Sequence, residues 1–173
     1  MINKTVYLVD IMKVIVADVA TKLGKSVYYK YGGFKEVFNE LEQLANNDTY
    51  TNYPLVWLIT DFEQKKGIGI NIYSEATVNM LIFNKTLPEW SSEQRTLYSF
   101  KAQLHPIYEQ LISSIEASHS INSGFGESEH KQTDHYSWGR DKIEMTKDGK
   151  PFSDYIDAVE INNLTLKIYK QNC

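Results

Sequence analysis

The residues with the most obvious chemical potential lie between positions 129 and 135, where an acidic residue precedes each of two histidines. Imidazole and carboxylate groups are common ligands of transition metals, so His130, Asp134 and His135 form the natural candidate set. A zinc site needs several converging ligands, and neither HxxxH nor HExxH spacing occurs in the sequence. The stretch therefore favours a solvated polar segment, and a small metal-dependent hydrolase that uses these three residues stays an alternative.

No other sequence pattern indicates an activated nucleophile or a phosphate site. A Gly-x-Ser-x-Gly turn is absent, and Gly67 and Gly69 lack the Gly-Lys-Ser/Thr that completes a phosphate-binding loop. Acidic pairs such as Asp154 with Asp157 are typical of helix caps and of surface carboxylates. The sequence thus predicts a protein that is not an enzyme, with no catalytic, metal-binding or cofactor-binding residue.

A second group of residues indicates contact with other proteins. Residues 118–135 read as one long polar loop, and loops longer than about 12–15 residues in a compact domain are usually functional or disordered. The aromatic residues Tyr136 and Trp138 follow it directly, which suits a segment that docks on a neighbouring subunit. We take these two, with Phe125 and His135, as candidate subunit-interface residues. Trp138 is equally compatible with a core position.

Composition narrows the class of partner. The formal net charge of the 173-residue chain is -4, which disfavours direct nucleic-acid binding because phosphates require a cationic surface. The one cysteine, Cys173, excludes an internal disulfide. No signal peptide and no apolar run of about 20 residues, as a membrane span requires, is present. We expect folding in a reducing cytoplasm and no membrane contact.

The spacing of apolar residues predicts one α+β domain over residues 1–173. Adjacent strands without intervening helices favour a small antiparallel sheet with helices on one face. Pro106 is expected to kink or split the longest helix near His105, and Asn162-Asn163 marks a bulge or turn in the last strand. The predicted elements are helices over 4–23, 34–45 and 91–117 and strands over 26–31, 55–59, 77–84 and 157–169.

This layout resembles the small neck proteins of bacteriophages, which include tail terminators, tail-completion proteins and head–tail joining proteins. The segments that carry the resemblance are the N-terminal helix, the strands over 53–58 and 76–83, the long helix with Leu104-His105-Pro106-Ile107-Tyr108, the segment Tyr136-Ser137-Trp138-Gly139 and the closing strands over 154–168. The region 118–152 is longer than in a typical tail terminator, so terminator and other neck ring stay open.

The resemblance implies a hexameric or dodecameric ring in the virion, made in the bacterial host cytoplasm. Such a ring ends the tail tube or joins it to the head portal complex, contacts other neck, portal or tail proteins, and lets DNA pass without sequence-specific binding. It implies no catalytic residue. A monomeric assembly adaptor that is missing from the finished particle is a further alternative.

Overall fold

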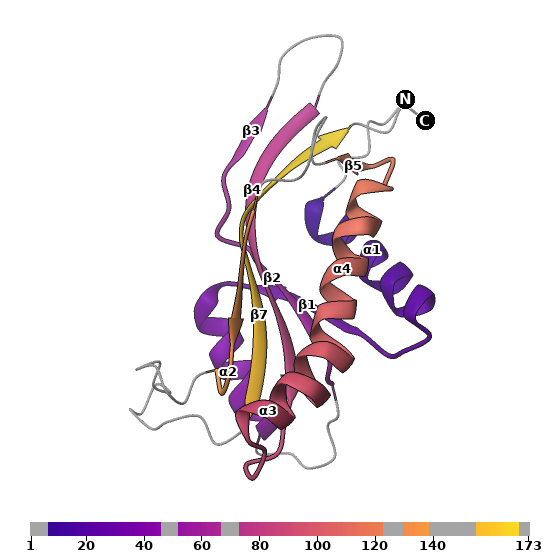
Figure 1. Ribbon diagram of the computed structural model, residues 1–173. Coiled ribbons are helices and arrows are strands. Elements are labelled where there is room, and N and C mark those ends of the chain that lie inside the picture. The colour runs from indigo at the N-terminus through magenta and orange to yellow at the C-terminus, as the bar shows by residue number, and fades with distance from the viewer. Residues whose placement is uncertain (1–6, 46–51, 67–72, 123–129, 139–154, 170–173) are drawn as a thin grey trace.

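The computed structural model describes residues 7–45, 52–66, 73–122, 130–138 and 155–169. These residues form an α+β fold in which a mixed sheet, mostly antiparallel, carries helices on both faces (Figure 1). The strands are β1 (Tyr28–Gly32), β2 (Leu55–Ile59), β3 (Gln64–Lys66), β4 (Tyr73–Lys85), β5 (Ile121–Asn122), β6 (Lys131–His135) and β7 (Ile156–Tyr169). The helices are α1 (Leu8–Leu23), α2 (Phe34–Ala45), α3 (Ser92–Arg95), the π-helix η1 (Thr96–Leu104) and α4 (His105–Glu116).

The prediction of helices on one face only is wrong. Strands β1 and β2 pair in parallel, and every other strand pair in the described residues is antiparallel. Parallel neighbours need a crossover connection, and α2 supplies it between β1 and β2. As a result α2 covers one face of the sheet, and α1 and α4 cover the other (Figure 1).

A β-bulge divides the sheet into two parts. Asn79 of β4 lies opposite both Asn162 and Asn163 of β7, and Asn163 takes a left-handed φ of 61°. The Asn163 backbone N–H donates to Asn79 Oδ1 at 2.9 Å. On one side of the bulge the order is β1-β2-β4-β7-β6, which we call the main half-sheet; on the other side β3 and β5 flank the same two strands and form the ribbon half-sheet. The bulge predicted at Asn162-Asn163 is confirmed.

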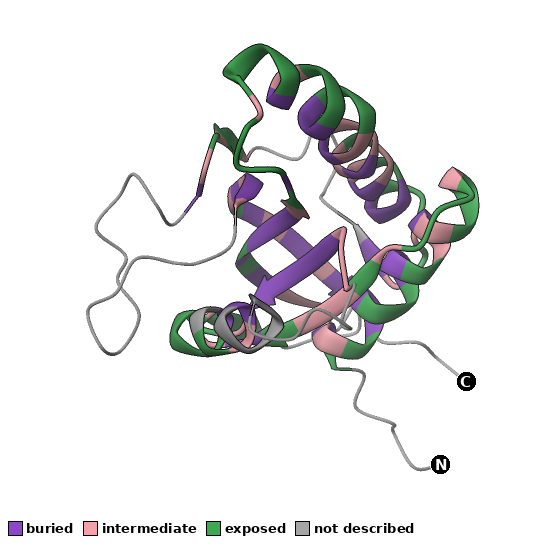
Figure 2. Cartoon of the chain, turned by 90° about the horizontal axis from the view of Figure 1, so that it is seen from below, coloured by how far each residue is buried: buried purple, intermediate pink, exposed green. Residues whose placement is uncertain are grey.

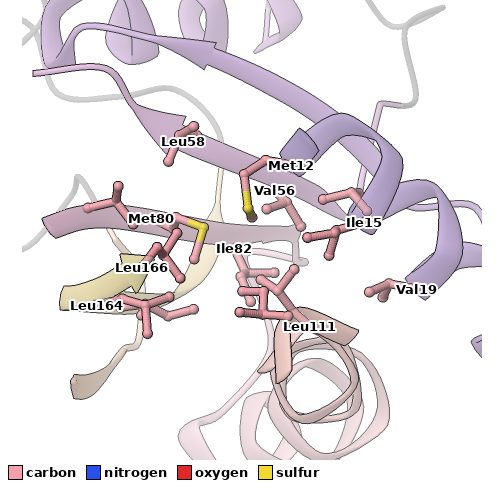
Figure 3. Close-up of a cluster of buried hydrophobic side chains, with 14 of the residues drawn as sticks. Met12, Ile15, Val19, Val56, Leu58, Met80, Ile82, Leu111, Leu164 and Leu166 are labelled. Carbon is pink, nitrogen blue, oxygen red and sulfur yellow. The ribbon is translucent and has the colours of Figure 1, made fainter. Parts of the chain in front are cut away.

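Each face of the sheet has its own core. The larger core joins α1, α4 and the sheet, and Figure 3 shows side chains from α1, β2, β4, α4 and β7 meeting there. The smaller core lies under α2 and includes Val37, Leu41, Trp57, Phe83 and Trp138. All five residues of β2 are buried, as expected for a strand covered on both faces. Figure 2 shows the buried strands at the centre and the exposed outer faces of the helices around them.

Near His105, where a kink or split is predicted, the long helix changes its hydrogen-bonding pattern, but Leu104 and His105 both keep helical backbone angles. The helix begins with a capping box formed by Ser91 and Gln94 and then widens into η1, which ends at Leu104 where α4 begins. Pro106 has no N–H to donate to the Ala102 carbonyl four residues earlier. The Lys25 ammonium donates to that carbonyl at 2.9 Å, so a side chain that follows α1 supplies a donor there.

The predicted loop over residues 118–135 is wrong in two places. Ile121–Asn122 and Lys131–His135 are strands, and both pair with β7. The side chains of β6 are mostly exposed, so this strand follows from backbone pairing and has no apolar pattern. Within the described part of the chain, no helix has the length and apolar character to cross a membrane.

Candidate functional site: the two open edges of the main half-sheet

The structure separates the predicted interface residues. Tyr136 is 39% exposed; its ring packs on Phe100 with centroids 4.4 Å apart, and its hydroxyl is hydrogen-bonded to Thr96 at 2.7 Å. Trp138 takes the core position that was weighed against an interface role, because it is 8% exposed and meets Phe83 edge-on at 4.9 Å. Phe125 lies outside the described residues. Of these three aromatic residues, Tyr136 is therefore the one with a described surface position.

The candidate metal ligands do not converge. Consecutive residues of a strand point to opposite faces, so Asp134 lies on the α4 face and His135 on the α2 face. Asp134 bonds His105 at 2.8 Å, and His135 bonds Glu160 at 2.7 Å. His130 Nε2 bonds the Tyr108 hydroxyl at 2.6 Å. Among the described residues, no group of three or more His, Cys, Asp or Glu side chains could hold a metal ion.

These side-chain pairs attach β6 to its surroundings. Burial raises the pKa of Tyr108, and the nearby carboxylates of Glu109 and Asp134 raise it further. The phenol therefore keeps its proton and is able to donate to His130 when that ring nitrogen accepts. The side chains of Asp134 and His105 are 29% and 33% exposed, so their pair is partly solvated. On the α4 face, β6 and the residue before it are therefore held by the Asp134–His105 and His130–Tyr108 hydrogen bonds, and none of these side chains is fully buried.

A buried ion pair fixes the start of β7 and the turn after β6. Arg95 Nη1 donates to Asp157 Oδ1 at 2.8 Å and to Thr86 Oγ1 at 2.7 Å, and the two charged side chains are 5% and 0% exposed. The Ser137 backbone N–H also donates to Asp157 Oδ1, at 3.0 Å. The expectation that Asp157 is a surface or capping carboxylate is wrong. Arg95 was missed because nothing in its sequence neighbourhood distinguishes a buried arginine from an exposed one on a helix.

Strand β6 leaves one side of its backbone open. The Ile156 carbonyl accepts from the Trp138 N–H at 2.7 Å, whereas the Tyr155 carbonyl accepts from Thr86 at the end of β4 at 2.7 Å. Backbone groups alternate sides along a strand, so Ala158 and Glu160 face β6, where their partners are His135 and Thr133. The N–H and C=O groups of Gln132 and Asp134 therefore point away from β7. No other strand in the described residues pairs there.

Strand β1 is open in the same way at the opposite edge. Tyr28 N–H donates to the Pro54 carbonyl at 2.9 Å, and the Gly32 carbonyl accepts from the Thr60 N–H at 3.1 Å, so the even-numbered residues face β2. The backbone groups of Tyr29 and Tyr31 point outward. Burial raises the pKa of the Tyr29 phenol, and Tyr31 and Asp10 raise it further; the hydroxyl donates to the Val9 carbonyl of α1 at 3.0 Å.

A shallow hollow of about 430 Å³ lies beside β1, between α1 and α2. Its lining includes Lys13 from α1, Tyr29 and Tyr31 from β1, and Glu36 from α2. Opposite charges from the two helices therefore reach it from the two faces of the sheet. Glycine at position 32 leaves room for these neighbours, because a Cβ would meet the Glu36 carboxylate and would lie 3.1 Å from the Trp57 ring.

Within the described part of the chain, the main half-sheet thus ends in two different strands whose outward backbone groups have no strand partner. Such edges are sites where another strand can add. Comparison with known proteins finds no protein-family model and no curated protein that matches this sequence.

Proposed function

We propose that the chain is a structural subunit of a phage virion neck or tail. Several copies form a hexameric or dodecameric ring that ends the tail tube or joins it to the head portal complex. The observation that carries the proposal is the pair of unlike open edges, β1 and β6, at opposite ends of the main half-sheet. A ring of identical subunits needs two different surfaces that fit each other, because its contacts are heterologous.

A second surface suits contact with unlike neighbours. Large apolar side chains are exposed after the end of β4, in η1 and in the turn after β6: Leu87 is 48% exposed, Leu97 53% and Tyr98 50%. Arg95 joins these segments, since its guanidinium donates to the Leu87 carbonyl at 3.2 Å and it precedes η1. Apolar and tyrosine side chains gathered at one end of a fold favour a protein partner, here another neck, portal or tail protein.

The charge of the chain suits a passive channel. A net charge of -4 gives little attraction for phosphates, so DNA would pass through the ring without sequence-specific binding. The virion is the proposed location, after synthesis in the bacterial host cytoplasm.

Light scattering after size-exclusion chromatography tests this proposal directly. The purified chain should have the mass of a closed ring at micromolar concentration, and particle images should show a ring with a central hole. The chain should also be present in purified virions. A protein that is monomeric at every concentration and missing from virions would contradict the proposal.

A monomeric assembly adaptor is the second candidate. The side chains of β6 are polar and charged and all but His135 are exposed, and short charged edge strands are a usual protection of monomers against unwanted pairing. In this case the chain would bind one partner at equal stoichiometry and would be absent from the finished particle.

A further inference from the structure

We propose that neighbouring copies join by adding strand β6 of one copy to the open edge of strand β1 of the next. The inference rests on the proposed assembly of identical copies and names the contact that holds it together. It starts from the backbone. Among the residues that the structure describes, each edge strand has two residues, two positions apart, whose outward N–H and C=O groups meet no other strand. These residues are Tyr29 and Tyr31 on β1, and Gln132 and Asp134 on β6.

Strand direction makes the pairing antiparallel. Strand β1 runs with β2, and the successive antiparallel pairs β2–β4, β4–β7 and β7–β6 leave β6 running opposite to β1. If the copies are related by a rotation axis parallel to the strands, each strand points in the same direction in every copy. The same face of the sheet then faces the axis in every copy. Repetition of the chain around such an axis places β6 of one copy antiparallel to β1 of the next, as a closed ring requires.

One register satisfies the outward groups. Tyr29 opposite Asp134 and Tyr31 opposite Gln132 are then the hydrogen-bonded pairs, and together they exchange about four backbone hydrogen bonds. Lys30 lies opposite Thr133 in the intervening pair. The faces agree as well: Tyr29 reaches α1, and Asp134 reaches His105 at the start of α4, so both lie on the α1–α4 face.

Charge complementarity supports the same register. On the α1–α4 face, Asp134 of one copy comes to the side of the hollow that Lys13 lines. On the α2 face, Lys131 comes opposite Gly32, where the Glu36 carboxylate occupies the space of the missing side chain. An acid therefore meets a base on each face. Such pairs fix register and partner choice more than they add affinity.

Engineered cysteines test the register. Lys30 and Thr133 would form a non-hydrogen-bonded antiparallel pair with Cα atoms about 4.5 Å apart, within the range of a disulfide. In a Cys173→Ser background, an equal mixture of the Lys30→Cys and Thr133→Cys chains should give disulfide-linked dimers under mild oxidation. Each variant alone should give none, and the double variant should give a ladder that ends at the full ring.

The matched control pairs Lys30→Cys with Lys131→Cys, which lies two residues along the same face of β6 and about 7–8 Å away by the same geometry. It should cross-link much less. Cross-linking by Lys30→Cys alone would indicate two-fold pairing of β1 with itself and would overturn the proposal. Light scattering on the same samples separates the failures: rings without the 30–133 cross-link contradict only this contact, and monomers contradict the ring as well.

A proline pair gives an independent test. The Gln132 N–H points away from β7, so Gln132→Pro removes no backbone hydrogen bond to β7 but blocks strand addition. It also removes the exposed side-chain hydrogen bond in which Gln132 Nε2 donates to Asp134 Oδ1 at 3.1 Å. We expect a folded monomer, with circular dichroism like that of the unmodified chain. Thr133→Pro is the counterpart, because it removes a donor to β7 and should disturb β6 itself. A Gln132→Pro chain that still forms full rings would overturn the proposal.

Discussion

The two outer strands of the main half-sheet are held in place by different means. Strand β1 lies between two helices, with Tyr29 bonded to α1 on one face and Gly32 close to Glu36 and Trp57 on the other. The side chains of β6 are mostly exposed, and its far end is fixed by the buried Arg95–Asp157 pair. One open edge is therefore positioned by contacts with helices on both faces of the sheet, and the other mainly by an anchor at its end. Substitutions that weaken β1 and substitutions that weaken β6 should therefore lower the free energy of unfolding by different amounts.

The largest effect is expected from loss of the anchor of β6. Arg95→Met would leave the Asp157 carboxylate buried without its cation, which should lower the free energy of unfolding by about 3–5 kcal/mol. Urea denaturation measures the loss. In the double variant Arg95→Met with Asp157→Leu much of the stability should return, because no buried charge is left. A single variant that loses under about 1 kcal/mol would show that packing also holds this end.

A smaller effect is expected at the β1 edge. Gly32→Ala places a methyl group against the Glu36 carboxylate and 3.1 Å from the Trp57 ring, and such crowding typically costs about 1–3 kcal/mol. Gly33→Ala is the matched control, since its Cβ would meet its nearest atom, Asp61 Oδ2, at 3.8 Å. Thermal denaturation of the two variants should rank Gly32→Ala as the less stable. Equal stability would mean that Glu36 moves away at little cost.

The side-chain contacts along β6 should contribute less than its anchor. His105→Gln removes the partly exposed hydrogen bond between the imidazole and the Asp134 carboxylate, and a loss of about 0.5–1.5 kcal/mol is expected. Hydrogen exchange at the Thr133 amide would report any loosening of β6. A loss as large as that of Arg95→Met would remove the distinction between the two edges.

The smallest effect concerns the link between the helices that cover the larger core. The Asp18 carboxylate of α1 accepts hydrogen bonds from Lys22 of the same helix and from Ser114 of α4. These hydrogen bonds lower the pKa of Asp18 below its usual 3.8. Because the folded state lowers this pKa, the stabilisation is present above pH 3.8 and is lost as the pH falls through the folded value. Asp18→Asn should therefore be slightly less stable than the parent chain at pH 7, and the difference should shrink as the pH falls below 3.8. Thermal melts across this pH range would show this.

Apolar spacing was sufficient for part of the fold. Helix 34–45 and strand 55–59 have their predicted bounds. The helix carries an apolar stripe at three- and four-residue spacing, and the strand is an unbroken apolar run, as burial on both faces requires. Strand β6 has the sequence Lys-Gln-Thr-Asp-His, which contains no such periodicity, and its conformation comes from pairing with β7. The buried role of Arg95 depends on Asp157, which is 62 residues away, and local patterns carry no such information. The open edges likewise follow from strand order, which single segments do not specify.

The bulge at Asn79 has a consequence for the shape of the molecule. Val159 and Ile161 before it, and Leu164 and Leu166 after it, all enter the same core, although their spacing changes parity at the two asparagines. Deletion of Asn163 would restore a two-residue period and keep Val78 opposite Leu164, so the same side chains would stay inside. The extra residue is thus unnecessary for burial. A β-bulge bends its strand and increases the local twist, so the extra residue changes the direction in which the ribbon half-sheet leaves the main half-sheet.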